Sequence, residues 1–475
     1  MRYNYFSRAI FLFASLILVS SCLNFRRPST VVREPSMPGE SRITYTVPEA
    51  PRVSLSVGEA LMSWRGLIGK VDKITDGVYL ARGFAIANMA MVVTDEGVVI
   101  IDATESPEAA REIMAKFRKI TDQPVKYLIY THGHGDHTQG STVLKEPGIK
   151  VIATKEFLEF VKFETGLIGP YLRMARNTQS GRIAPDFVRV KLPVKMAVRA
   201  DVGTADMLMP DVTFDGRYEF TLGGEKFELY HGPGETPDAL FIWMPQKRAL
   251  ICGDNYYTSF PNLSTPMLAP RSITDWYQSI EKMLALKPEY LVPGHSAGVS
   301  GEKEVMQTLQ NYHDAIKSVF DQTIAAINQG KTVDEAVQVV KLPANLAGYH
   351  YLQEYYGRVD WAVRGIYAGN RGWYSGDGGD LVPDPPSYKA RELVLLAGGA
   401  DKILNRAIEL QKANEHQLAI ELCDVIIQAN PKDKTAHLVK AVSLEKLAME
   451  SDNINKFGFY FSASQKEFQA AGYKP

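Results

Sequence analysis

Short runs of apolar and β-branched residues recur through the first 300 positions of the chain, separated by turn-forming residues. The runs that fit strands cover residues 77–81, 89–94, 98–102, 125–130, 150–153, 227–230, 239–244 and 249–252. Helical spacing of apolar residues occurs between them, at residues 108–117, 157–161 and 273–286. Because strands and helices alternate, the pattern predicts an α/β domain over residues 61–315.

The pattern changes after His313, where helical spacing dominates and few strands are readable. Helices are predicted at residues 314–328, 333–340, 401–413 and 416–429. The last of these and a further helix ending near Met449 resemble a tetratricopeptide-type helix pair, although one unit does not make a repeat array. We therefore expect an all-α domain over residues 316–475.

Residues 163–221 are weakly patterned and rich in Arg, Met and Gly. A segment of this length inside an α/β domain is either a lid that contacts substrate or a packed decoration that does not. The sequence leaves both interpretations open.

The composition is that of a globular protein, with 45% hydrophobic and 23% charged residues and a formal net charge of -1. This balance gives no reason to expect a nucleic-acid partner. Cys252 and Cys423 lie far apart without paired spacing, so neither a disulfide framework nor a thiolate metal site is predicted.

The N-terminus indicates export. Arg2 and Arg8 precede an apolar run at residues 9–19 that is too short to span a bilayer, so residues 1–21 are interpreted as a signal peptide. Val19-Ser20-Ser21-Cys22 resembles a bacterial lipobox, with Cys22 as the lipidated residue and residues 22–60 as a tether. The alternative is a plain signal peptide with an incidental cysteine. In either case we expect an exported protein, and with the lipid a membrane-anchored one on the periplasmic or cell-surface side.

The strongest chemical motif is Thr131-His132-Gly133-His134-Gly135-Asp136-His137, at the end of a predicted strand. It places three imidazoles and one carboxylate within six residues. These groups suit Zn²⁺ and similar ions, and so tight a loop cannot readily direct all four to one ion. The motif therefore predicts two adjacent metal ions.

The same motif is the hallmark of the metallo-β-lactamase superfamily, and the resemblance implies its αββα sandwich and two Zn²⁺ per chain. Members usually have a second histidine in a downstream His-x-x-Gly-His segment, whereas this chain has His231-Gly232-Pro233-Gly234-Glu235. Glutamate at this place is typical of the alkylsulfatase branch, which has an acidic ligand nineteen residues later, here Asp254. The last ligand is expected in Pro293-Gly294-His295.

The resemblance implies a role for each of these side chains. One metal would be held by His132, His134 and Glu235, the other by Asp136, His137 and His295, with Asp254 bridging them and Asp136 also counted as catalytic. The implied reaction is the cleavage of an alkyl sulfate ester by metal-activated water.

Substrate contacts are harder to assign. Asn262, Tyr257 and Arg176 are candidates, but the arginine that grips sulfate in this branch is not found directly after Asn262-Leu263. Arg271 matches a different, later arginine of the branch, and Arg176 or Arg182 could substitute for the missing one. Loss of a planar guanidinium would weaken sulfate recognition.

Residues 356–364, 372–377 and 396–400 resemble the alkylsulfatase dimerisation domain, which implies a homodimer. The resemblance as a whole implies a small-molecule ester as substrate, amphiphilic where it carries an alkyl chain. Two alternatives stay open. The fold also serves hydrolases of lactones, thioesters, phosphoesters and β-lactams. The second alternative is a lipoprotein that binds a partner and keeps only a vestigial metal site. Such a protein would bind far fewer than two metal ions per chain.

Overall fold

The computed structural model describes residues 41–51, 69–181, 207–269 and 271–473. The predicted signal peptide, Cys22 and most of the predicted tether lie outside the described residues, as does Arg182. Within the described ranges, no helix is both long enough and apolar enough to cross a bilayer.

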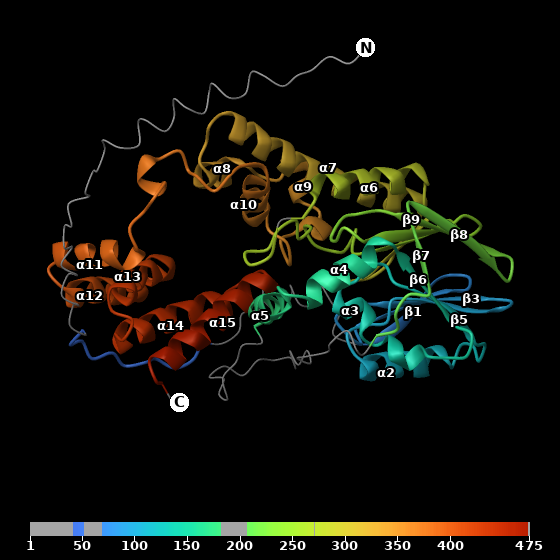
Figure 1. The fold of residues 1–475 in the computed structure, drawn as a ribbon, viewed down its shortest axis with the longest axis horizontal. Helices are drawn as coiled ribbons and strands as arrows, with labels where there is room; N and C mark the ends of the chain where they lie inside the picture. The colour runs from blue at the N-terminus through green and yellow to red at the C-terminus, as the bar shows by residue number, and fades with distance from the viewer. Residues whose placement is uncertain (1–40, 52–68, 182–206, 270, 474–475) are drawn as a thin grey trace, which may run out of the picture.

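Two mixed β-sheets form the N-terminal part of the structure (Figure 1). The first has seven strands in sequential order: β1 (Lys70–Thr75), β2 (Val78–Arg82), β3 (Met89–Thr94), β4 (Gly97–Ile101), β5 (Val125–Ile129), β6 (Lys150–Thr154) and β7 (Val212–Phe214). The second has six strands, also adjacent in sequence: β8 (Arg217–Leu222), β9 (Glu225–His231), β10 (Leu240–Met244), β11 (Ala249–Gly253), β12 (Tyr290–Pro293) and β13 (Val299–Ser300). Apolar side chains of both sheets meet in one core, among them Val99 and Ile129 of the first sheet and Leu229 and Ile251 of the second.

Helices cover the outer face of each sheet. Against the first sheet lie α2 (Pro107–Phe117) and α4 (Glu156–Thr165), whose buried residues share a core with β3 to β6. Ser106 caps α2 by accepting a hydrogen bond from the amide of Ala109, and Pro107 occupies its first turn. Against the second sheet lie α6 (Ile273–Ala285) and α7 (Glu302–Asn328). The order helix, sheet, sheet, helix confirms the predicted αββα sandwich.

The region after the second sheet is helical, as predicted. It contains α8 (Val333–Val339), α9 (Ala344–Ala347), α10 (Val359–Asn370), α11 (Pro386–Leu396), α12 (Ala400–Lys412), α13 (His416–Ala429), α14 (Lys434–Met449) and α15 (Ile454–Ala470). The expected domain boundary at residue 315 falls inside α7, which runs unbroken from one expected domain into the other. Helices α7 to α10 share a core with α6 and the second sheet, whereas α11 to α14 build a core of their own.

Two segments connect the outer helices with the rest of the chain. Residues 41–51 run along them, with the Ser41 amide and hydroxyl bound to Asp433 and the Tyr45 phenol bound to Gln411. The weakly patterned segment after Phe163 contains α5 (Gly169–Gln179), which lies against α15 (Figure 1). A Cβ atom at Gly458 of α15 would come within 1.8 Å of the Gln179 carbonyl oxygen, so this contact requires glycine.

Candidate metal centre

The seven residues expected to bind metal come together at one edge of the two sheets. Each follows the end of a strand: His132 and His134 follow β5, Glu235 follows β9, Asp254 follows β11 and His295 follows β12. Asp136 and His137 are carried by the short helix α3 (Gly135–Thr138), directly after the β5 loop. Strand ends of an α/β fold commonly carry the ligand-binding residues, because the loops there are held by a rigid sheet.

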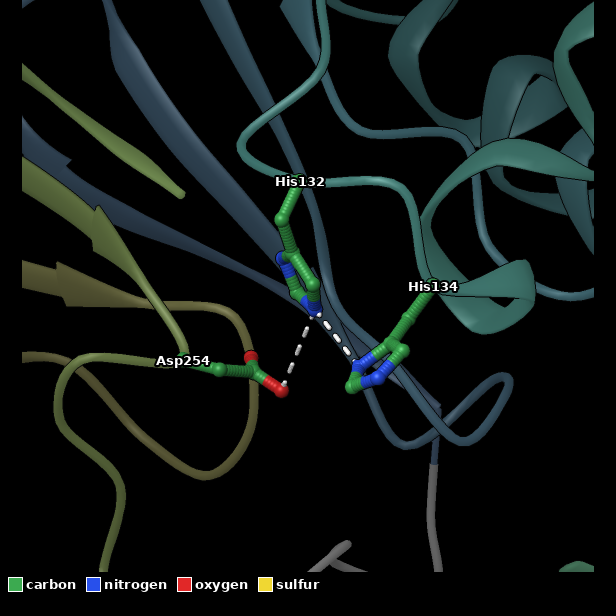
Figure 2. A group of neighbouring side chains, drawn as sticks. All are labelled: His132, His134 and Asp254. Carbon is green, nitrogen blue, oxygen red and sulfur yellow. Dashed lines mark hydrogen bonds and ion pairs between the residues drawn. The ribbon is translucent and has the colours of Figure 1, made fainter. Parts of the chain in front are cut away.

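The first group contains His132, His134 and Asp254, whose ligand atoms all lie within 4.8 Å of one another. Figure 2 shows both imidazoles pointing toward the carboxylate from the neighbouring loop. The His132 Nε2 atom lies 3.0 Å from His134 Nδ1 and 3.8 Å from Asp254 Oδ2. Glu235 stands beside this group, with its Oε1 atom 4.0 Å from His134 Nδ1.

The second group contains Asp136, His137 and His295. The Asp136 Oδ2 atom lies 3.5 Å from His295 Nε2 and 3.8 Å from His137 Nε2. Asp254 reaches this group too, with Oδ1 at 3.4 Å from His137 Nε2 and Oδ2 at 3.1 Å from His295 Nε2. Its carboxylate therefore lies between the two groups, where a bridging ligand would be needed.

Three buried polar atoms without hydrogen-bond partners among the described residues indicate whether these side chains suit metal ions. His137 Nε2, Asp254 Oδ1 and Glu235 Oε2 are buried and have no hydrogen-bond partner among the residues that the structure describes. A buried polar atom without a partner destabilises a fold by about 1–3 kcal/mol. Imidazole nitrogens and carboxylate oxygens converging in this way are ligands for zinc and related divalent ions. The residues present therefore fit two metal sites.

Two carboxylates that the sequence analysis did not single out hold the ligand loop in place. Asp102 accepts a hydrogen bond from His137 Nδ1 at 2.8 Å and another from the Thr131 hydroxyl at 2.8 Å, and Thr131 Oγ1 lies 3.1 Å from His132 Nδ1. Asp238 accepts a hydrogen bond from the amide of Gly133 at 2.7 Å. Such outer partners fix the orientation of imidazole ligands and direct the other ring nitrogen to the centre.

The backbone at Asp102 has a φ of 60°, in the left-handed region that non-glycine residues rarely adopt. Asp102 is also 2% exposed. Strain of this kind persists where the surroundings enforce it, and here the enforced conformation carries the carboxylate that orients His137.

Burial shapes the charges of the ligands. It lowers the pKa of His132 and of His134 well below the usual range, which keeps both imidazoles neutral, the form that binds metal. Burial raises the pKa of Glu235 to about 7, against the opposing charge of Arg271. Burial lowers the pKa of His137, but the carboxylates of Asp254, Asp102 and Asp136 raise it by more, so the pKa lies well above its usual value.

Arg271 is a buried charged residue beside Glu235 that the sequence analysis matched to a later arginine of the branch and did not include among the substrate contacts. Its Nη2 atom lies 2.7 Å from Glu235 Oε1, its Nη1 atom donates to the Asn262 carbonyl oxygen at 2.5 Å, and its guanidinium lies over the ring of Trp276. A loop after Asn262 brings the side chain back to the centre. No local spacing could have revealed this, because the placement depends on how that loop folds.

The three predicted substrate contacts all lie near the centre. The Asn262 side chain is fully buried, and neither its amide nitrogen nor its oxygen has a hydrogen-bond partner in the described part of the chain. The buried Tyr257 phenol oxygen accepts a hydrogen bond from the backbone N–H of Asn262 at 2.7 Å. Arg176 of α5 forms an ion pair with Glu164 of α4, and its charge contributes, after burial, to the lowered pKa of His134.

Comparisons with known proteins agree with this arrangement. Residues 82–295 match the metallo-beta-lactamase superfamily, and residues 332–469 match the alkyl sulfatase dimerisation family. A linear primary-alkylsulfatase from a Pseudomonas species is 35% identical over 387 residues, which cover 79% of this chain and 73% of that protein. The alkyl/aryl-sulfatase BDS1 of Saccharomyces cerevisiae is 27% identical over 421 residues, which cover 86% of this chain and 65% of the yeast protein.

A solved structure has the same fold. It is that of a stereoselective inverting sec-alkylsulfatase, Pisa1, from Pseudomonas sp., with a TM-score of 0.77 and 24% sequence identity. The match covers 88% of this chain and 68% of that one, so it includes both the sandwich and the helical region.

Proposed function

Because the chain belongs to the alkylsulfatase branch of the metallo-β-lactamase superfamily and is a metal-dependent hydrolase, we propose that it hydrolyses alkyl sulfate esters at a centre of two zinc ions. One observation supports this substrate class above the others. A buried guanidinium, Arg271, stands beside the metal-binding groups together with Asn262, whose buried side-chain amide has no hydrogen-bond partner among the described residues.

These two side chains suit a sulfate group. A guanidinium offers several N–H donors in a fixed plane, and Arg271 uses one nitrogen on Glu235 and another on the Asn262 carbonyl. The Asn262 amide adds two further N–H donors at a buried position. A sulfate ester presents several oxygen acceptors and one negative charge, so it can take donors from both residues.

Two bound metal ions would supply Lewis-acid activation of water and compensate the charge that develops on the leaving oxygen. The chain's own residues do the rest. Arg271 and Asn262 would hold the sulfate oxygens, and Asp102 and Thr131 keep His137 and His132 in the orientation that binding requires. Burial of the ligands limits competing water at the centre.

The test is release of inorganic sulfate from dodecyl sulfate by purified, zinc-loaded protein, with metal-stripped protein as control. We expect release by the loaded protein alone. If two metals are bound and no sulfate is released, the substrate class is wrong, and a panel of lactones, thioesters, phosphoesters and β-lactams becomes the next step.

We also propose that the protein is exported and anchored to a membrane through a lipid on Cys22. The support is the apolar run after Arg2 and Arg8 and the lipobox-like residues before Cys22. Mass spectrometry of the mature N-terminus should find a lipidated Cys22, and Cys22→Ser should release the protein from the membrane fraction. A mature chain that begins elsewhere would contradict the proposal.

A homodimer is the proposed assembly, supported by the match of residues 332–469 to the dimerisation family. Trp373, Val382 and Leu396 in this region expose most of their apolar side chains, as an interface would. Sedimentation of the purified protein should give twice the mass of one mature chain. A monomer at micromolar concentration would contradict it.

A further inference from the structure

The helical hairpin formed by α4 and α5 exposes an unusual number of apolar side chains. Six of the large hydrophobic residues that are exposed in the described parts of the chain lie between residues 158 and 174, namely Leu158, Phe163, Leu167, Ile168, Tyr171 and Met174. Leu167, at the tip of the hairpin, is fully exposed. Apolar surface gathered in one place normally marks a binding surface rather than a random distribution.

This surface begins at a metal ligand. The ring of Phe160 in α4 lies 5.6 Å from the ring of His134, and a Cβ atom at Gly133 would lie 2.8 Å from Phe160 Cδ1. Phe163 lies one helical turn after Phe160 on the same face of α4, and Leu167 lies in the turn that follows α4. Phe160, Phe163 and Leu167 therefore form one apolar stripe that leads from His134 outward to the tip of the hairpin.

The second helix of the hairpin is connected to the loop that supplies the anion-binding arginine. The Tyr171 hydroxyl donates a hydrogen bond to the carbonyl oxygen of Met267 at 2.9 Å, and Met267 lies between Asn262 and Arg271 in the chain. Met174 follows Tyr171 by one helical turn and is also exposed. The apolar hairpin and the proposed sulfate-binding residues thus flank the same centre.

The charged pair nearest to Phe160 in the sequence of this hairpin is neutralised. Glu164 is mostly buried and forms an ion pair with Arg176, so two opposite charges cancel beside Phe160. A ligand with an anionic head at Arg271 and a hydrocarbon tail would therefore meet an apolar surface in the direction of Phe163 and Leu167.

We infer that the stripe Phe160–Phe163–Leu167, with Tyr171 and Met174 beside it, binds the alkyl chain of a single substrate molecule. The stripe, rather than the metal centre, then sets the preference for chain length. This inference rests on the proposed function, because it takes the head of the ligand to be a sulfate ester.

The experiment measures kcat/KM for a series of linear alkyl sulfates of increasing length, each kept below its micelle-forming concentration. A buried methylene contributes about 0.8 kcal/mol, so each added methylene in contact with the stripe should raise kcat/KM up to about fourfold. The double variant Phe163→Ser, Leu167→Ser should flatten this dependence and leave the rate on the shortest ester unchanged. Val339→Ser on α8 is the matched control, since Val339 is 54% exposed and Phe163 is 53% exposed.

A second readout separates this inference from the proposed function. Alkyl sulfonates carry a similar anionic head that is not hydrolysed, and their affinity for the zinc-loaded protein can be measured by calorimetry. If affinity rises with chain length in the parent and in Val339→Ser but not in the double variant, the inference stands even if no sulfate ester is cleaved. If the double variant retains the parent's dependence on length in both measurements, the inference is wrong.

Discussion

The two sides of the metal centre are built differently. On the ligand side, histidines and carboxylates follow strand ends, five of the seven are buried, and further partners such as Asp102 orient them. On the substrate side, the α4–α5 hairpin exposes apolar side chains and Asn262 has an amide without a hydrogen-bond partner among the described residues. The comparison indicates that the fold fixes the positions of the metal-binding side chains, whereas the shape and polarity of the other side suit the substrate.

This difference follows from what each side must do. Metal ligands need fixed positions, and strands that share a core between two sheets provide them. Substrate selection needs a surface that can vary without disturbing the core, and a helical hairpin outside the first sheet provides it. Substitutions on the two sides should therefore have separable effects on metal binding and on substrate recognition.

The largest effect is expected on the ligand side. His295→Ala removes a proposed metal ligand whose Nε2 atom lies near both Asp136 and Asp254, so activity should fall by more than the roughly 100-fold that loss of an outer partner costs. The amount of bound metal, measured by inductively coupled plasma mass spectrometry, should fall below two ions per chain. The control is His313→Ala, because His313 lies on α7 and binds Glu281 and Asp314 outside the centre. Equal losses in both variants would mean that His295 has no special role.

The next effect tests the substrate side. Arg271→Gln removes the charge of a buried guanidinium, and truncating one partner of a buried charge pair costs about 2–5 kcal/mol. We therefore expect kcat/KM for alkyl sulfates to fall about 100-fold, mainly through KM, with metal content unchanged. A neutral ester that the parent hydrolyses slowly should be affected much less. If both substrates lose activity equally, Arg271 acts on Glu235 rather than on sulfate.

Asp102→Asn should have a smaller effect on the ligand side. It keeps the size of the side chain but replaces the carboxylate that accepts the His137 proton with a neutral amide. Loss of such an outer partner typically lowers metal affinity or activity by roughly 10- to 100-fold. A chelator should therefore remove metal from the variant at a lower concentration than from the parent protein. An unchanged metal affinity would contradict the orienting role of Asp102.

Gly458→Ala should have the smallest effect, and only on the substrate side. The added methyl group would collide with the Gln179 carbonyl oxygen and push α5 away from α15. Overpacking of this kind destabilises a fold by about 1–3 kcal/mol, so the free energy of unfolding should fall and KM should rise several-fold with metal content unchanged. Gly348→Ala is the control, since a Cβ atom there would meet nothing within 4 Å. Identical behaviour of the two variants would disprove the docking role of Gly458.

The same two sides explain what the sequence could predict. The His132 to His137 cluster is local, and Glu235, Asp254 and His295 were assigned from the resemblance to the alkylsulfatase branch, so the structure brings together residues that were identified beforehand. The alternation of strands and helices predicted an α/β domain, and the resemblance implied its αββα arrangement. Short strands such as β12, with four residues, carry too little pattern to be read.

What could not be predicted depends on contacts distant in sequence. Arg271 reaches Glu235 through the fold of a loop, and Phe160 meets His134 because α4 packs over the first sheet. Helix α7 crosses the expected domain boundary because its buried face joins the core of the second sheet. The roles of the individual metal ligands and the domain limits stay predictions.

The most direct test of the dinuclear centre is a metal titration of the stripped protein, with sulfate release from dodecyl sulfate followed against zinc equivalents bound per chain. Two adjacent groups that share Asp254 predict that activity rises until two ions are bound and then stays constant. Full activity with one ion per chain, or activity without metal, would contradict the account.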